Sequence, residues 1–154
     1  MGDALDFRAN LDEAALMAYI NKLSHDGADL MVKVWGSASR GIGGLVAPHA
    51  MQATMHNVIA PTTGNASNQA MQCGKISDQL VHTYKFQLFA GVVDTIPCFL
   101  RVHAQIYLEL SDYRRLAEAV LEILRSTDDA AQDLTPPLNS MVAPAPLGAA
   151  IAEQ

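Results

Sequence analysis

The stretch FLRVHAQIYLELSDYRRLAEAVLEIL, residues 99–124, decides the fold that we predict for this chain. Every second residue in its first half is apolar: Leu100, Val102, Ala104, Ile106, Leu108 and Leu110. The residues between them are mostly polar: Arg101, His103, Gln105, Tyr107 and Glu109. This alternation is typical of a strand with one face in a core and the other face exposed. We therefore predict a strand over residues 100–110, with Arg101 near the start of its polar face.

A helix is predicted to follow this strand directly. Ser111 is a favourable N-cap, and Asp112 would lie in the first turn, where the helix dipole stabilises a carboxylate. Apolar residues then recur at helical spacing, at Leu116, Val120, Ile123 and Leu124. The apolar face of the strand is expected to pack against helices.

The longest helical pattern lies upstream and begins near residue 10. Asn10 followed by Glu13 is a variant of the capping box, and apolar residues recur every three or four positions as far as Val34. Gly27 costs about 1 kcal/mol relative to alanine in a helix interior, so we expect a kink or break near residues 25–27. The glycine-rich run that begins at Gly36 ends this helix.

Residues 45–61 fit two interpretations. A short helix that begins at Pro48 would place Met51, Met55, Val58 and Ile59 on one side. Alternatively, a loop leads into a strand over residues 54–60, which Pro61 ends. Periodicity does not decide between the two, because the segment is short.

The remaining elements complete an α+β prediction. Residues 61–69 are expected to form a loop and residues 69–83 a helix. Residues 84–88 would form a second strand. A turn over residues 91–97 would lead into the strand 100–110, so that the two strands pair antiparallel. The expected fold is a long helix followed by a small antiparallel sheet of about three strands, with helices covering one face. Residues 127–154 are rich in proline and alanine without periodicity, which predicts a disordered tail.

Composition argues against several classes of partner. The formal net charge is −6 and the ten Lys and Arg residues form no basic patch, so we expect no nucleic-acid partner. No apolar run is long enough to span a bilayer, and acids occupy the positions where a signal peptide needs basic residues. A cytoplasmic protein without a membrane partner is therefore expected.

Cysteine and histidine spacing gives no indication of a metal centre. Cys73 and Cys98 make neither a disulfide framework nor a metal knuckle, so we expect two small thiols, buried or half-buried. His49, His56, His82 and His103 show no spacing that is typical of metal ligands. His49 and His56 would share a face only if their segment were helical, so no metal site is predicted.

The pattern RVxAQIY at residues 101–107, followed by DY at 112–113 and LA at 116–117, resembles a known family. It is similar to the C-terminal end of the class V aminotransferase-fold enzymes that depend on pyridoxal phosphate (PLP). The isopenicillin-N-epimerase-like branch, related to cysteine desulfurases and selenocysteine lyases, resembles it most. Weaker similarities at residues 4–7, 35–36 and 58–61 extend the resemblance to residues 4–124 and favour the strand over residues 54–60.

The resemblance implies the C-terminal small domain of PLP fold type I. Residues 1–9 would be the end of an interdomain helix, residues 10–126 the small domain, and residues 127–154 the tail. The family's large domain holds PLP, and its cofactor-binding residues have no counterpart in this chain. We therefore expect no catalysis by the chain alone. The implied partners are a large PLP-binding domain, on the same or a separate chain, or a second copy in a homo-oligomer such as a dimer.

Arg101 matches the family's substrate-binding arginine. A guanidinium presents a planar fork of donors that fits the α-carboxylate of an amino acid and orients its Cα. His103 and Tyr107 share the predicted strand face with Arg101 and are expected near the site. His103 stands where the family has a small Ser or Ala, and Leu108 where it often has Asn. The implied chemistry of the whole protein is that of an amino-acid epimerase, lyase or desulfurase; the alternative is a non-catalytic interaction or oligomerisation module.

Overall fold

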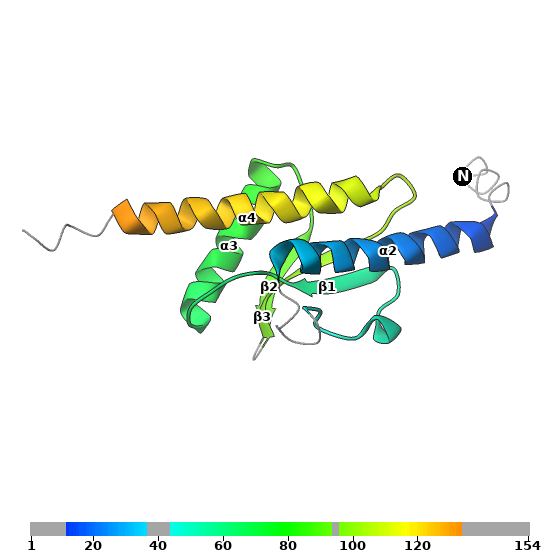
Figure 1. Cartoon of the computed structure of the whole chain (residues 1–154), viewed down its shortest axis with the longest axis horizontal. Coiled ribbons are helices and arrows are strands. Elements are labelled where there is room, and N and C mark those ends of the chain that lie inside the picture. Colours follow the sequence, from blue (N-terminus) through cyan, green and yellow to red (C-terminus); the bar gives the residue numbers. More distant parts are fainter. Residues whose placement is uncertain (1–11, 37–43, 94–95, 134–154) are drawn as a thin grey trace, which may run out of the picture.

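The structure, a computed structural model, describes residues 12–36, 44–93 and 96–133. In chain order these residues form α2 (Glu13–Trp35), the 3-10 helix η2 (His49–Met51), β1 (Met55–Ile59), α3 (Ala66–His82), β2 (Phe89–Val93), β3 (Ile96–His103) and α4 (Leu110–Asp133). The strands form an antiparallel sheet in the order β1-β3-β2. α2 and α3 pack against this sheet, and α4 lies alongside α2 and also packs on α3 (Figure 1). The predicted α+β fold with a small three-stranded sheet is confirmed.

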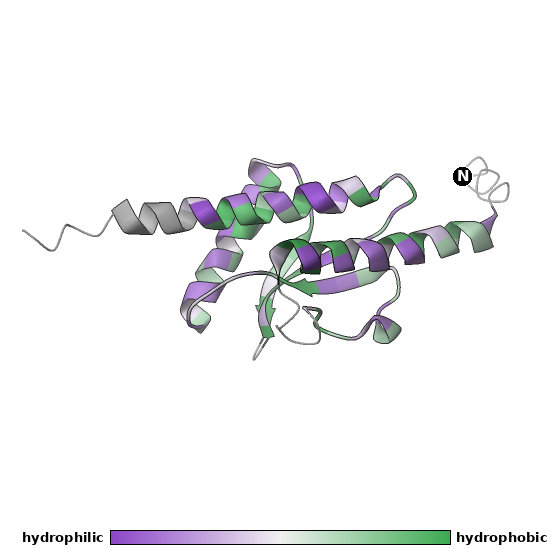
Figure 2. Ribbon diagram, in the orientation of Figure 1, coloured by the Kyte–Doolittle hydropathy of each residue, from purple (hydrophilic) through white to green (hydrophobic). Residues whose placement is uncertain are grey.

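The core lies between the sheet and the helices. β3 buries Leu100 and Val102, whereas Arg101 and His103 alternate with them and are exposed. The helices contribute Met31, Trp35, Ile76, Leu80, Leu116, Val120 and Ile123 to the same core. Hydrophobic residues accordingly alternate with hydrophilic ones along the helices and strands (Figure 2). The predicted alternation is therefore correct as far as residue 103.

The predicted strand over residues 100–110 is wrong beyond His103. β1 pairs with β3 only as far as Met55, which lies opposite His103, and no other strand in the described part of the chain continues the ladder. The backbone N–H of Ala104 still donates to the Thr54 carbonyl (3.1 Å), after which the chain turns at residues 106–107. The alternation persists in the sequence because Ala104 and Leu108 pack into the core from a loop.

The helix that follows begins one residue before the predicted cap. α4 starts at Leu110, and the Glu109 backbone N–H donates to the Asp112 carboxylate (2.9 Å). This contact is one half of a capping box with Glu109 in the N-cap position, so Ser111 lies inside the helix. α4 continues to Asp133, and the tail predicted from residue 127 therefore begins inside a helix, while residues 134–154 lie outside the described residues.

α2 is continuous, so the kink predicted near residues 25–27 does not occur. Gly27 is buried against the ring of Tyr113 in α4, and a Cβ at this position would lie 2.5 Å from the ring carbon Cδ1. The missing side chain lets the two helices approach each other closely. This contact explains why a residue with low helix propensity occupies the middle of the helix.

The ends of α2 are capped by single residues. The Asp12 carboxylate accepts a hydrogen bond from the Ala15 backbone N–H (3.0 Å), so Asp12 is the N-cap, and the predicted cap Asn10 lies outside the described residues. Gly36 ends the helix in the left-handed conformation, with φ of 61°, as predicted.

Residues 45–61 adopt the strand interpretation, since β1 follows the short helix η2. The prediction of a second strand over residues 84–88 is wrong, because β2 begins only at Phe89. Lys85 has φ of 61°, outside extended geometry, and the Phe86 N–H donates back to the Leu80 carbonyl (2.8 Å). This segment therefore folds onto the end of α3. Residues 91–93 and 96–97, which were expected in a turn, belong to β2 and β3.

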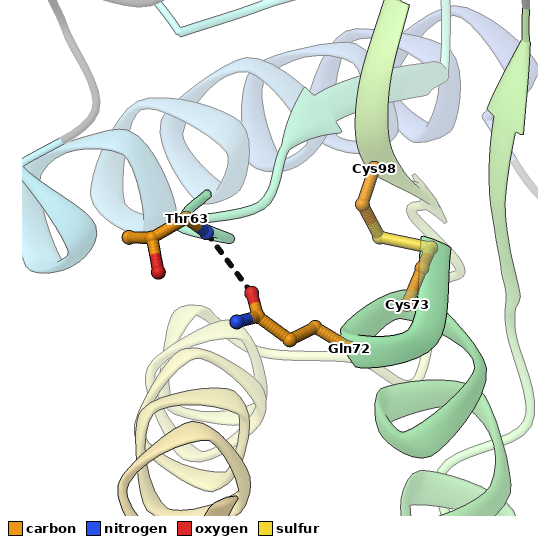
Figure 3. The surroundings of a disulfide bond; sticks show 4 residues. All are labelled: Thr63, Gln72, Cys73 and Cys98. Carbon is orange, nitrogen blue, oxygen red and sulfur yellow. Dashed lines mark hydrogen bonds between the residues drawn. A yellow bond between two sulfur atoms is a disulfide. The ribbon is translucent and has the colours of Figure 1, made fainter. Parts of the chain in front are cut away.

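A disulfide joins Cys73 of α3 to Cys98 of β3 (Figure 3), so the prediction of two thiols is wrong. The cysteines are 25 residues apart in the sequence, but α3 packs on β3 and brings their Cα atoms to 5.6 Å, within reach of a disulfide. The residue before Cys73, Gln72, accepts a hydrogen bond at its side-chain oxygen from the Thr63 N–H (2.9 Å) and holds the loop that precedes α3 (Figure 3).

The substitution Gly27→Ala should destabilise the fold, because the new methyl group needs space that the Tyr113 ring occupies. We expect the free energy of unfolding to fall by about 1–3 kcal/mol, as in other overpacked cores. Gly74→Ala is the matched control: no atom lies within 4 Å of its Cβ position in α3, so a gain of about 0.5–1 kcal/mol is expected. Urea unfolding followed by Trp35 fluorescence measures both, and equal effects would contradict the close packing at Gly27.

Reduction of the disulfide should lower the free energy of unfolding by roughly 3 kcal/mol, because it releases the unfolded chain from a loop closed across a separation of 25 residues. The double variant Cys73→Ser/Cys98→Ser should show the same loss and no further response to a reducing agent. Titration of free thiols in the chain purified without a reducing agent checks whether the disulfide is present. Two reactive thiols in the unfolded, unreduced chain would refute it.

Candidate functional site

A pocket of about 330 Å³ opens beside the end of β3. Three segments line it: residues 85–88 before β2, residues 101–103 of β3, and residues 107–116 around the start of α4. The three residues that the sequence analysis placed in a site all line this pocket, namely Arg101, His103 and Tyr107. Its volume lies at the lower end of the range for small-molecule sites.

The Arg101 guanidinium is oriented from both neighbouring strands. In the register of the sheet Arg101 lies opposite Asn57 of β1 and Phe89 of β2. Its Nε–H donates to Asn57 Oδ1 (3.1 Å), and its Cζ lies 5.3 Å from the centre of the Phe89 ring. The two terminal nitrogens make no hydrogen bond with the described residues. The side chain is thus fixed at Nε. The edge of the guanidinium that carries the two Nη nitrogens, which we call its terminal edge, can therefore bind a planar anion.

His103 and Tyr107 reach the pocket by different routes. His103 is the last residue of β3 and shares the exposed face of Arg101, as predicted. Tyr107 lies in the turn before α4, with 76% of its surface exposed, and is not on a strand face as predicted. The chain reversal after residue 103 therefore brings Tyr107 to the pocket.

The charges at the pocket come mainly from Arg101, Lys85 and Asp112. The pKa of Tyr113 is raised to about 12, mainly because the phenol is buried, with smaller contributions from Asp112 and Tyr19. Tyr113 therefore stays protonated and donates to the His103 carbonyl (2.9 Å), which fixes the end of β3. The role of Tyr113 in the pocket is to hold the backbone.

The described pocket residues do not form a PLP site by themselves. Such a site needs an amine for the Schiff base and an acid for the pyridine nitrogen. The Lys85 ammonium donates to the His82 carbonyl (2.7 Å) at the end of α3. The Asp112 carboxylate caps α4 and lies 3.6 Å from Arg115. Both groups are engaged in holding helix ends.

Comparison with protein-family models gives no match for this chain, and comparison with curated proteins gives none either. The resemblance carried by residues 101–107 therefore stays a prediction.

A second site, which the sequence analysis did not predict, is formed by three histidines. His25 of α2, His49 of η2 and His56 of β1 bring one nitrogen each within 4.8 Å of the others. The centres of the rings lie 4.6 Å (His25 to His49), 4.9 Å (His25 to His56) and 5.0 Å (His49 to His56) apart. We refer to these three residues as the histidine cluster.

A chain of hydrogen bonds runs through the histidine cluster. Ser24 Oγ lies 2.7 Å from His56 Nδ1, His56 Nε2 lies 2.9 Å from His49 Nδ1, and His49 Nε2 lies 2.8 Å from Asp29 Oδ1. The Asp29 carboxylate can only accept, so His49 Nε2 donates to it. With both rings neutral, His56 Nε2 then donates to His49, and the Ser24 hydroxyl donates to His56.

The sequence analysis missed the histidine cluster because its members come from three elements. The spacing of His49 and His56 indicated a shared face only in a helix. Instead, the chain turns after η2, and the Asn57 N–H donates to the Gln52 side-chain oxygen (2.9 Å), which holds this turn. His25 and Asp29, four residues apart on α2, were a signal available in the sequence.

The fold should lose stability in acid through His56. The pKa of His56 is lowered from 6.5 to about 4, mainly because the ring is buried; the neighbouring His49 and His25 contribute to this lowering, and Asp29 opposes it. Below about pH 6.5 the unfolded chain binds a proton that the folded chain excludes, so the free energy of unfolding falls as the pH decreases toward 4. The contribution of His56 to this loss is roughly 3 kcal/mol.

Urea unfolding between about pH 7 and pH 4 measures this dependence, with His56→Gln as the variant that lacks the titrating group. The variant should lose less stability than the wild type over this range. His82→Gln is the control, since His82 is exposed on α3 and should keep the wild-type dependence. An unchanged pH dependence in His56→Gln would refute the assignment.

Proposed function

We propose that this chain is the small-domain part of a PLP-dependent class V aminotransferase-like protein and binds the α-carboxylate of an amino-acid substrate at Arg101. The observation that carries the proposal is the orientation of the Arg101 guanidinium: Nε is bonded to Asn57 and the terminal edge has no bond to the described residues. Two parallel charge-assisted hydrogen bonds to a carboxylate would use that edge.

The pocket supports this role beyond Arg101. Lys85 adds a second positive charge to its lining, and the exposed Tyr107 contributes a hydroxyl group. A carboxylate held at Arg101 would leave the amino group and side chain of the ligand to point out of the pocket. Fixing one end of the substrate in this way orients the bonds at its Cα for reaction.

Catalysis would require a partner that holds the cofactor. PLP supplies an electron sink for reactions at the amino-acid Cα, and the described pocket residues do not hold it. We propose that a large PLP-binding domain, on the same or a separate chain, covers the Arg101 side of the sheet. The choice among epimerisation, elimination and desulfuration would then depend on that domain.

An oligomerisation module is the second candidate, favoured by the edge strand β2. Among the described residues β2 pairs only with β3, and it exposes Phe89 (53%), Val92 (38%) and Val93 (47%). Unpaired apolar edges of this kind pair readily with another strand. A second copy of this chain could cover the edge by pairing β2 with β2 in a symmetric dimer.

The disulfide bears on the compartment in which the protein works. None of the described helices is long and apolar enough to span a membrane. The cytoplasmic location expected from the sequence stays a prediction, and the Cys73–Cys98 bond weighs against it, because disulfides persist mainly in oxidising compartments.

Carboxylate binding can be tested with the full chain and a simple amino acid such as alanine as the probe. We expect saturable binding, detected by ligand-observed NMR, that Arg101→Gln weakens at least tenfold, because one glutamine amide cannot replace a charged two-donor fork. Arg114→Gln is the matched control, since Arg114 is exposed on α4 and does not line the pocket.

Equal affinity of the wild type and Arg101→Gln would overturn the proposed role of Arg101. Alanine amide should bind far more weakly than alanine, which separates carboxylate recognition from general affinity for the pocket. Sedimentation of the same samples tests the second candidate. A dimer that Val93→Lys dissociates would support pairing through β2, whereas a monomer at all concentrations would rule out self-association.

A further inference from the structure

We propose that the histidine cluster, His25, His49 and His56, binds a divalent transition-metal ion of the zinc class through three imidazole nitrogens. The three rings come from α2, η2 and β1, so the ion would join the helix layer to an edge of the sheet. This inference does not rest on the proposed function, because the two sites are separate. His56 lies on the buried face of β1 with Val58, whereas Arg101 lines the pocket.

The spacing of the rings is close to that of a zinc site. Zinc–nitrogen bonds of about 2.0–2.1 Å in tetrahedral geometry place two ligand nitrogens about 3.3 Å apart. His49 Nδ1 and His56 Nε2 are 2.9 Å apart and directed at each other. A widening of about 0.4 Å, together with a tilt of both rings that turns their lone pairs toward a common point, would exchange the proton between these two nitrogens for a metal ion.

The proton balance of this exchange is simple. The ion replaces the proton on His56 Nε2, and the neutral His56 ring then carries its proton on Nδ1. That nitrogen donates to the Ser24 oxygen, 2.7 Å away, in the reverse direction of the metal-free hydrogen bond. His49 keeps its Nε2 proton and still donates to Asp29 (2.8 Å). No net proton is released when both rings start neutral.

The contacts of His49 and His56 with Asp29 and Ser24 are of the kind that metal-binding histidines usually make on the side of the ring away from the metal. We call the groups that make them outer partners. A ligand imidazole normally donates its second N–H to a carboxylate, hydroxyl or carbonyl, which fixes the ring and strengthens its bond to the metal. Asp29 serves His49 in this way, and Ser24 serves His56. Both partners lie on α2, the helix that also carries His25.

His25 completes the set and provides the least constrained ligand. Its ring makes no hydrogen bond with the described residues, and its centre lies 4.6 Å from that of His49. A rotation of this half-buried side chain would aim a nitrogen at the ion. His25 and His49 are only half-buried and the Asp29 side chain is 66% exposed, so an ion could enter from solvent.

The donor set selects the class of ion. Three imidazoles suit zinc, copper and nickel, whereas calcium and magnesium prefer oxygen ligands. The fourth position would be left for water. A polar network in a core is costly unless every member is satisfied, and apolar side chains would fill the same space without that requirement. Metal binding would account for the presence of a polar network at this place in the core.

Isothermal titration of the tag-free, chelator-treated full chain with Zn²⁺ tests the proposal. We expect one ion per chain, an increased melting temperature, and visible absorption of tetrahedral Co²⁺ when cobalt replaces zinc. His25→Ala should abolish saturable binding while leaving the fold intact, because this ring makes no hydrogen bond with the described residues. Asp29→Asn should weaken binding by about 10- to 100-fold, as expected for an outer partner.

His82→Ala is the matched control, since His82 is exposed on α3 beside Asp78 and lies outside the cluster. It should bind Zn²⁺ as the wild type does. Absence of saturable binding in the folded wild type would overturn the proposal. Equal affinity in the wild type and His25→Ala, or a loss of binding in His82→Ala, would also overturn it, because the ion would then be bound elsewhere.

Discussion

The pairing of β3 between β1 and β2 is the constraint on which the rest of the structure depends. Because β3 is hydrogen-bonded on both sides, its residues alternate strictly between two faces. Leu100 and Val102 anchor the helices on one face, and Cys98 ties α3 to the strand. The other face presents Arg101, held by one contact from each neighbouring strand.

The two candidate sites lie at different places around this sheet. The Arg101 pocket uses the exposed end of β3 and the loop that returns to α4. The histidine cluster uses the buried side of β1 and the covering helix α2. α2 packs against both α4 and β1, and Gly27 permits its close approach to α4. The same helix supplies His25 to the histidine cluster and Asp29 to its chain of hydrogen bonds.

The parts of the fold that the sequence predicts well are those in which local pattern and tertiary contact agree. The alternation over residues 100–103 and the end of α2 at Gly36 are of this kind. The alternation over residues 104–110 is equally regular, but β1 ends opposite His103, and a pattern does not reveal where a partner strand stops. The Cys73–Cys98 bond and the histidine cluster depend on how distant elements pack, which residue spacing does not encode.

We propose that the terminal edge of the Arg101 guanidinium binds a carboxylate. This can be tested by following the side-chain N–H signals of the arginines by NMR while alanine is added to the full chain. We expect the terminal Nη–H signals of Arg101 to shift, saturate and sharpen as rotation of the guanidinium slows, while those of Arg114 and Arg115 stay unchanged. Equal, non-saturating shifts of all arginines, or no shift at Arg101, would contradict it.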